Sequence, residues 1–209
     1  MLFRSVVAAI GHLDATREQI EAAVSAGASL STHLGNGAHS MLPRHPNYLW
    51  AQLAEDRLAA SFICDGIHLD STFLKVALRA KGVERSLLIT DAVMPAGCEP
   101  GEYTLGEVAV RLHAEGKVTL LDSDRLAGSA LRMDRGLEVL MRLAGLSLRD
   151  AVTMAARNPA RAGRIAGRQR GLAPGDRADL VEFDFDPAAK SVVIRRTWVA
   201  GRLVYDRGV

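Results

Sequence analysis

The sequence predicts an α/β protein in which buried parallel strands alternate with amphipathic helices. In the first ninety residues, apolar runs of strand length alternate with segments of helical period. Continuous apolar runs are typical of parallel strands covered on both faces, and their alternation with helices is typical of βα units. The four apolar runs cover residues 5–10, 28–32, 58–64 and 85–90.

Helix signals separate these runs. Thr16, with Gln19 three residues later, forms a capping-box pattern before the first helical segment, and Gly27 follows that segment as a stop signal. The second helical segment lies around residues 49–53, and the third ends at Gly82. Each of the first three apolar runs is therefore expected to be followed by a helix that packs back on the sheet.

The second half of the chain changes character. Residues 103–121 read as short β segments, and residues 126–131 (LAGSAL) as a loop of small residues. Two helices are expected at residues 133–143 and 148–156, separated by Gly145. The tail is expected to return to β structure at residues 179–183, 191–199 and 202–205.

The composition is that of an ordinary globular protein. Of the 209 residues, 48% are hydrophobic and 24% are charged, and the formal net charge is +2. This balance argues against nucleic acid or an anionic membrane as the main partner, and no apolar run approaches the roughly 18 residues of a membrane span. Cys64 and Cys98 are too few for a disulfide framework, and the N-terminus is a poor signal peptide, so a cytoplasmic location is expected.

Four successive strand runs close at residues that carry chemistry: His12, His33, His68 and Asp91. In parallel α/β folds, functional residues lie just beyond the carboxyl ends of the strands. Imidazole is the commonest metal ligand, so His12 and His33 are candidate ligands of one metal ion. Asp91 suits the role of general acid/base, and His68 could donate a hydrogen bond to the substrate.

A structural interpretation competes at each position. A single His after an apolar run is usually structural, and an Asp after a strand is commonly a helix N-cap. Four such residues at four consecutive strand ends favour the functional interpretation. Arg44, Asn36 and Gly37, on the loop after the second run, could bind an anion, although arginines on loops are usually only solvated.

The combined pattern resembles the N-acetylglucosamine-6-phosphate deacetylases of the amidohydrolase superfamily. The matching pieces occur in the family's order and at similar spacing over nearly the whole chain. They are Gly11-His12-x-x-Ala15, Thr32-His33-Leu34-x-Asn36, Arg44-x-Pro46, Asp65-Gly66-x-His68, Thr90-Asp91-Ala92, Leu126-x-Gly128-Ser129, Asn158-Pro159-Ala160 and the Gly171–Leu180 segment.

The resemblance implies part of a TIM (β/α)₈ barrel, with strands five to eight and the helices that follow them. On this basis residues 1–170 form the C-terminal part of the barrel, with a β insertion at about residues 100–122. Residues 171–209 then contribute the C-terminal strands of a small β-sandwich. The implied reaction is hydrolysis of N-acetylglucosamine 6-phosphate to glucosamine 6-phosphate and acetate.

The resemblance also implies a role for each matching residue. His12 and His33 are metal ligands and Asp91 is the catalytic acid/base. The implied substrate-binding residues are Asn36, Gly37, Arg44, Asp65, Gly66, Ile67, His68, Leu126, Ala127 and Gly128. The implied cofactor is a divalent cation, Zn²⁺ first and Fe²⁺ or Co²⁺ as alternatives, and the complete enzyme is expected to be a homodimer.

Two departures from the family pattern leave alternatives open. Asn36 is followed by Gly37-Ala38, where the family usually has Ala-Met, so another acylated amino sugar is an alternative substrate. A hydrolase of the same superfamily that acts on a cyclic amide is a separate alternative. A complete barrel needs about 200–250 residues, and the family's third metal ligand, a Glu, has no counterpart before His12. We therefore expect an N-terminally truncated chain, or a non-catalytic fragment that needs a complementary half.

Overall fold

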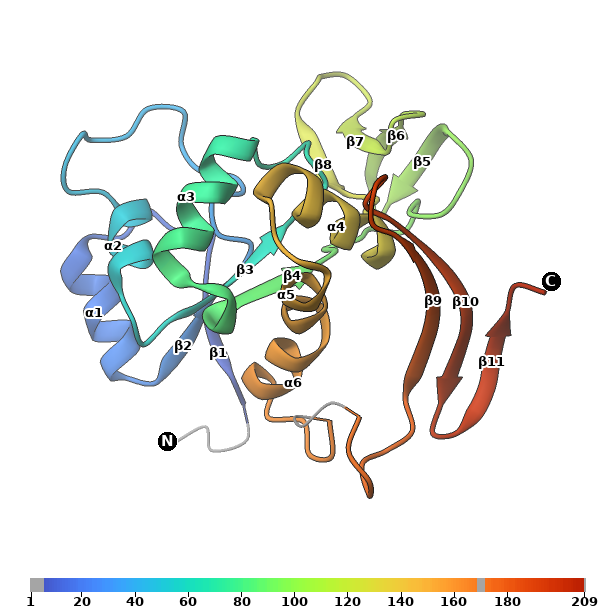
Figure 1. Cartoon of the computed structure of the whole chain (residues 1–209). Coiled ribbons are helices and arrows are strands. Elements are labelled where there is room, and N and C mark those ends of the chain that lie inside the picture. The colour runs from blue at the N-terminus through green and yellow to red at the C-terminus, as the bar shows by residue number, and fades with distance from the viewer. Residues whose placement is uncertain (1–5, 169–171, 209) are drawn as a thin grey trace.

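A four-stranded parallel sheet forms the first part of the protein (Figure 1). The computed structural model describes residues 6–168 and 172–208. The strands lie side by side in chain order and are β1 (Ala8–Ile10), β2 (Ala28–Ser31), β3 (Ala59–Ile63) and β4 (Ser86–Ile89). The four predicted strands are thus confirmed, except that residue 5 of the first run lies outside the described residues.

Three helices follow the first three strands: α1 (Arg17–Ser25), α2 (Tyr48–Ala54) and α3 (Ser71–Lys81). The predicted capping box is present, because the Thr16 side chain accepts from the Gln19 amide and the Gln19 side chain accepts from the Thr16 amide. Helix α3 ends at Gly82, which has a φ of +69°. A 3₁₀ turn (Val83–Arg85) then leads into β4.

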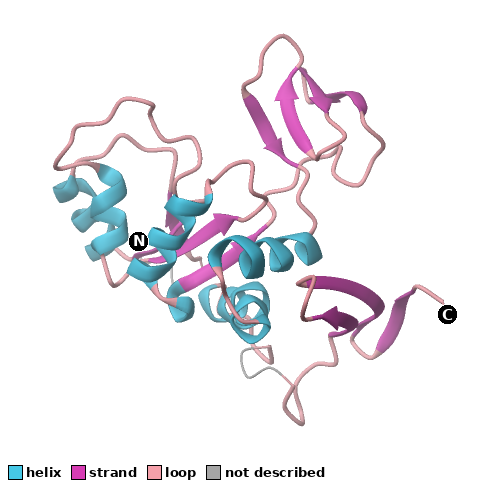
Figure 2. Ribbon diagram, turned by 45° about the horizontal axis from the view of Figure 1, so that its top comes forward, coloured by secondary structure: helices cyan, strands magenta, loops and turns pink. Residues whose placement is uncertain are grey.

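A second, antiparallel sheet follows β4 and stands apart from the parallel sheet in Figure 2. Its strands are β5 (Gly101–Leu105), β6 (Val108–Leu112), β7 (Lys117–Leu120) and β8 (Leu126–Ser129). The predicted loop at residues 126–131 is wrong in its first part, because residues 126–129 pair with β7. Small residues have a low intrinsic strand preference, and here the pairing with β7 stabilises the strand conformation. The sheet expected at about residues 100–122 therefore reaches Ser129.

Helices return after β8. Helix α4 (Met133–Val139) continues into a π-helical turn (Leu140–Ala144), which Gly145 ends at a φ of +75°. The next helical stretch consists of α5 (Leu148–Val152), a π-helical turn (Thr153–Arg157) and α6 (Asn158–Ala162). The predicted break at Gly145 is confirmed, and the second helical stretch is longer than expected.

The tail forms a three-stranded antiparallel sheet with the order β11-β10-β9. Its strands are β9 (Leu180–Asp186), β10 (Ser191–Val199) and β11 (Arg202–Asp206). Figures 1 and 2 show this sheet on the far side of α4 from the parallel sheet. The predicted boundary between residues 170 and 171 lies outside the described residues.

One apolar core joins the parallel sheet, the helices and the tail. Phe62 and Leu88, from β3 and β4, belong to the same buried cluster as Leu140, Met154 and Val192. The Val192 amide also donates to the Glu138 carboxylate over 2.9 Å, which ties β10 to α4. Burial of each large apolar side chain contributes about 1.5–3 kcal/mol, so this cluster is the main source of stability shared by the three parts.

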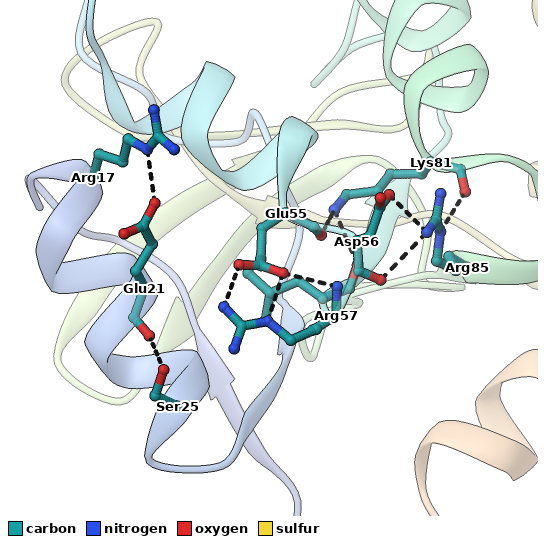
Figure 3. Close-up of polar contacts among 9 residues, drawn as sticks. Arg17, Glu21, Ser25, Glu55, Asp56, Arg57, Lys81 and Arg85 are labelled. Atoms are coloured by element: carbon teal, nitrogen blue, oxygen red, sulfur yellow. Dashed lines mark hydrogen bonds and ion pairs between the residues drawn. The ribbon is translucent and has the colours of Figure 1, made fainter.

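Lys81 is a buried cation at the end of α3 (Figure 3). Its Nζ donates to the carbonyl oxygens of Glu55, at 2.8 Å, and Leu58, at 2.9 Å. These bonds close the loop between α2 and β3, beside the ion pair of Arg85 with Asp56. Burial, with a smaller contribution from the positive charge of Arg85, lowers the pKa of Lys81 to about 8.

No helix in residues 6–168 and 172–208 is both long and apolar enough to span a membrane.

The low pKa of Lys81 predicts a pH-dependent stability. In the unfolded chain Lys81 keeps its proton up to about pH 10.4, so between pH 8 and 10.5 the unfolded state binds more protons and stability rises with pH. We expect Lys81 to contribute a rise of about 1–3 kcal/mol in the free energy of unfolding over this range. Denaturant unfolding of wild type and Lys81→Met at pH 7.5, 9 and 10.5 measures this difference.

The matched control is Lys75→Met, which removes an exposed lysine from the same helix. This variant should follow the wild-type pH dependence. A Lys81→Met curve parallel to that of wild type would contradict the assignment.

Candidate metal and substrate site

The candidate residues lie where strands of the parallel sheet end. His12 follows β1, His33 follows β2 and Asp91 follows β4. All three have left-handed backbones, with φ values of 47°, 31° and 49° respectively. Non-glycine residues adopt this conformation only at a cost of about 1–3 kcal/mol, and such residues cluster at functional sites. The chain therefore leaves each of these three strands through a residue with a positive φ.

The structure brings His12 and His33 together, as the sequence predicts. Their ring centroids are 4.4 Å apart and the rings are inclined at 69°. The approach depends on Gly11, since a Cβ atom there would lie 2.4 Å from Cγ2 of Thr32. Gly37 lies against the His12 ring, because a Cβ atom added at Gly37 would lie 3.4 Å from two atoms of that ring. Two imidazoles at neighbouring strand ends thus face one small cavity, which Asn36 and Gly37 also line.

His33 is the buried member of the pair, with 8% of its surface exposed, whereas His12 is exposed. The His33 amide donates to Oγ of Ser61 on β3 over 2.8 Å. Neutral imidazoles are good ligands for Zn²⁺, so the pair offers two nitrogen donors to a divalent cation. Within the described residues, no group of three or more His, Cys, Asp and Glu side chains is placed to hold a metal ion.

Asp65, Gly66, Ile67 and His68 form a turn after β3. The Asp65 carboxylate accepts from Nδ1 of His68 at 2.6 Å and from the amides of Ile67 and His68, both at 2.8 Å. Only 8% of the Asp65 side chain and 3% of the His68 side chain are exposed. Burial raises the pKa of Asp65, but the bonds from His68 and Ile67 outweigh it, and the net pKa lies below the ordinary value.

The remaining candidates lie on two other segments. Arg44 is exposed on the loop between β2 and α2, and no hydrogen bond or ion pair is found for it in the described part of the chain. Leu126, Ala127 and Gly128 are part of β8, not of a free turn. Strand β8 is nevertheless tied to the Asp91 strand end, because Ala92 bridges to Ser129 and the Val93 amide donates to the Ser129 carbonyl over 2.9 Å.

Sequence reasoning missed three residues of this site. Tyr48 and Gln52, both buried on α2, line the His12–His33 cavity. Ser61 holds the His33 backbone. Ser61 could have been noticed in the sequence, since it is the polar residue inside an otherwise apolar strand. Tyr48 and Gln52 follow the ordinary helical pattern, so nothing in the sequence distinguishes them as site residues.

Comparison with known proteins identifies the family. The Amidohydrolase family matches residues 122–205. An N-acetylglucosamine-6-phosphate deacetylase from Vibrio furnissii is 36% identical over 94% of this chain and 47% of its own length. A protein of Escherichia coli strain K12, provisionally named N-acetylgalactosamine-6-phosphate deacetylase, is 32% identical over 82% of this chain and 98% of its own length. The chain belongs to the N-acetylglucosamine-6-phosphate deacetylase family of amidohydrolases.

A solved structure supports the same assignment. It is a mutant N-acetyl-D-glucosamine-6-phosphate deacetylase from Mycobacterium smegmatis in complex with N-acetyl-D-glucosamine-6-phosphate, with a TM-score of 0.84 and 34% identity. The match covers 95% of this chain and 51% of that one. The chain therefore spans about half the length of the Vibrio and Mycobacterium family members. Amidohydrolases generally use a divalent metal.

The Asp65 turn predicts a pH-dependent contribution to stability. A carboxylate with a lowered pKa stabilises the fold above its unfolded pKa of about 3.9, and this contribution is lost as the pH falls through the folded value. We expect Asp65→Asn to lower the free energy of unfolding by about 1–2 kcal/mol at pH 6–7. The difference from wild type should shrink below about pH 4. Urea unfolding at pH 7, 5 and 3.5 measures it.

Asp122→Asn is the control, because Asp122 is exposed on the turn between β7 and β8. It should stay within about 0.5 kcal/mol of wild type at each pH. Equal stability of Asp65→Asn and wild type at pH 7 would show that the turn does not depend on the carboxylate.

Proposed function

We propose that this chain carries the metal-binding and acid/base part of an amide hydrolase that removes the acetyl group of N-acetylglucosamine 6-phosphate. The products are glucosamine 6-phosphate and acetate. The observation that carries the proposal is the shared left-handed backbone of His12, His33 and Asp91 at the ends of three strands, with the two imidazole rings 4.4 Å apart. Family membership supports the same chemistry.

In this proposal β1 to β4 are strands five to eight of a (β/α)₈ barrel. The parallel order β1-β2-β3-β4 and the helices between the strands support it. Residues 1–170 are then the C-terminal part of the barrel, and residues 171–209 contribute strands to a small β-sandwich. The rest of the barrel comes from a segment equivalent to the other half of the full-length relatives, in the same polypeptide or in a second one.

His12 and His33 would hold a divalent cation, which we propose is Zn²⁺. The donor set fits in part, since two nitrogen donors face one cavity and a third protein ligand is not found among the described residues. We therefore assign the third ligand, a Glu in the family pattern, to the complementary segment. When bound by His12 and His33, the cation would supply Lewis acidity toward the substrate carbonyl.

Asp91 acts as the general base and then as the general acid. Its carboxylate takes a proton from the water that attacks the acetyl carbon, and a C–O bond forms. It then gives a proton to the sugar nitrogen as the C–N bond breaks, so the amine and acetate leave. The exposed position of Asp91 after β4 supports this role, because the carboxylate faces no competing ion pair within the described residues.

His68 positions the substrate in this scheme. Asp65 binds its Nδ1 and holds the ring within the turn, which leaves Nε2 for the substrate amide or a sugar hydroxyl. Gly66 and Ile67 line the same side. Asn36, Gly37 and Arg44 bind the phosphate and the sugar from the loop after β2. Leu126, Ala127 and Gly128 contact the substrate from the β8 side.

The sugar stereochemistry has two candidates. The Vibrio relative is named for N-acetylglucosamine 6-phosphate, and the K12 relative for N-acetylgalactosamine 6-phosphate. We propose the former, because the Vibrio match is longer and more similar. We further propose that the complete enzyme is a homodimer. The free thiols of Cys64 and Cys98 support a cytoplasmic location.

Metal content and acetate release test this function. Wild type joined to the remaining half of the Vibrio relative should carry Zn²⁺ after purification, and the His12→Ala/His33→Ala double variant of this joined protein should lose it. Asp91→Asn should keep the metal. When joined to the remaining half of the Vibrio relative, Asp91→Asn should release acetate from N-acetylglucosamine 6-phosphate about 10²–10⁴ times more slowly than wild type. Zinc retained by the double variant would overturn the proposed site.

The loop arginine gives a separate prediction. Arg44→Ala in the same joined protein should raise KM for N-acetylglucosamine 6-phosphate by about 10–100-fold, because a charge-assisted bond to phosphate is lost. KM for unphosphorylated N-acetylglucosamine should not change. Arg79→Ala, an exposed arginine on α3, is the control. An equal rise in KM for both substrates would place Arg44 outside the phosphate site.

A further inference from the structure

Ser61 contacts the segment that carries His33 at two points. Its hydroxyl Oγ accepts from the His33 amide at 2.8 Å, and its carbonyl oxygen accepts from the Leu34 amide at 2.9 Å. Ser61 lies on β3, 28 residues after His33, and is 2% exposed. The contact is therefore a buried tertiary one, not a local turn.

The Ser61 hydroxyl accepts a hydrogen bond just beyond the point where the regular ladder between β2 and β3 ends. The pairing of the two strands runs from Leu30–Ala59 to Ser31–Ala60 and then stops. The Thr32 amide donates to the Ile10 carbonyl of β1 at 2.8 Å, whereas the Leu34 amide donates to the Ser61 carbonyl of β3. The His33 amide lies between these two bonds, in a buried residue, and its acceptor is a side chain. Without that oxygen it would be a buried donor with no partner in the structure as described.

This bond is needed because of the His33 conformation. A φ of 31° is unfavourable for a residue with a Cβ atom, and such a conformation persists only where its surroundings hold it. The same hydroxyl contacts the Ser31 carbonyl at 3.5 Å, so it bridges the end of β2 and the bend that follows. The bend directs the His33 ring toward the ring of His12.

We infer that Ser61 is a positioning residue for His33, and that its hydroxyl sets how tightly the His12–His33 pair binds a divalent cation. The inference rests on the proposed function for the metal, but the bond to the His33 backbone does not. In metal sites, partners that orient a ligand typically change metal affinity by about 10–100-fold when they are removed. Ser61 would act through the ligand's backbone, not through its ring nitrogen.

The test is a Co²⁺ titration of the full chain. Calorimetry and the visible absorption of the bound ion measure the binding. Ser61→Ala removes the acceptor and should bind Co²⁺ about tenfold or more weakly than wild type. Ser61→Thr keeps the oxygen and should restore most of the affinity. In a His33→Ala background, Ser61→Ala should have no further effect.

Ser86→Ala is the matched control for stability. Ser86 is buried on the neighbouring strand β4, and its hydroxyl donates to the Gly82 carbonyl at 2.8 Å, at the opposite end of that strand from Asp91. It should lose stability as Ser61→Ala does but bind Co²⁺ within about twofold of wild type. Ser61→Ala binding Co²⁺ as tightly as wild type would overturn the inference, as would equal losses of affinity in Ser61→Ala and Ser86→Ala.

A readout without metal separates this inference from the proposed function. Amide hydrogen exchange of His33, followed by NMR, should be about tenfold or more faster in Ser61→Ala and unchanged in Ser86→Ala. If wild type binds no Co²⁺ through His12 and His33 but this exchange pattern holds, the effect on metal affinity fails for this chain and the positioning role stands. If His33 exchange is the same in Ser61→Ala and wild type, the positioning role fails.

Discussion

The site depends on the parallel hydrogen-bond ladder of β1 to β4. A parallel ladder aligns strands in the same direction, so their carboxyl ends reach one edge of the sheet together. At that edge the chain must leave the ladder, and at His12, His33 and Asp91 it does so through a left-handed residue. At His33 this strain is offset by the hydrogen bond from the His33 amide to Ser61 on the neighbouring strand.

Apolar packing joins the parallel sheet to the rest of the protein. The cluster that contains Phe62 and Leu88 extends through Leu140 and Met154 to Val192 of the tail. Glu138 adds a polar tie, since its carboxylate accepts from the Val192 amide and pairs with Arg135 and Arg142. The helices after β8 thus connect the parallel sheet to the C-terminal sheet, and neither needs the antiparallel β5–β8 sheet for this contact.

Much of the fold and part of the site could be predicted from local patterns. The Thr16 capping box, the end of α3 at Gly82 and the break at Gly145 are decided by a few neighbouring residues. Strand β8 could not be predicted, because its small residues become a strand only by pairing with β7. Ser61 could be seen as a polar residue in an apolar strand, but its partner is 28 residues away.

By itself the sequence determined which residues end each parallel strand, because hydrophobic runs and helix signals act over a few residues. It therefore placed His12, His33, His68 and Asp91 at strand ends and related them to a family. Only the tertiary structure decided that the rings of His12 and His33 meet and that Ser61 binds the His33 backbone. Those contacts depend on backbone angles and on the register between strands, which no local pattern encodes.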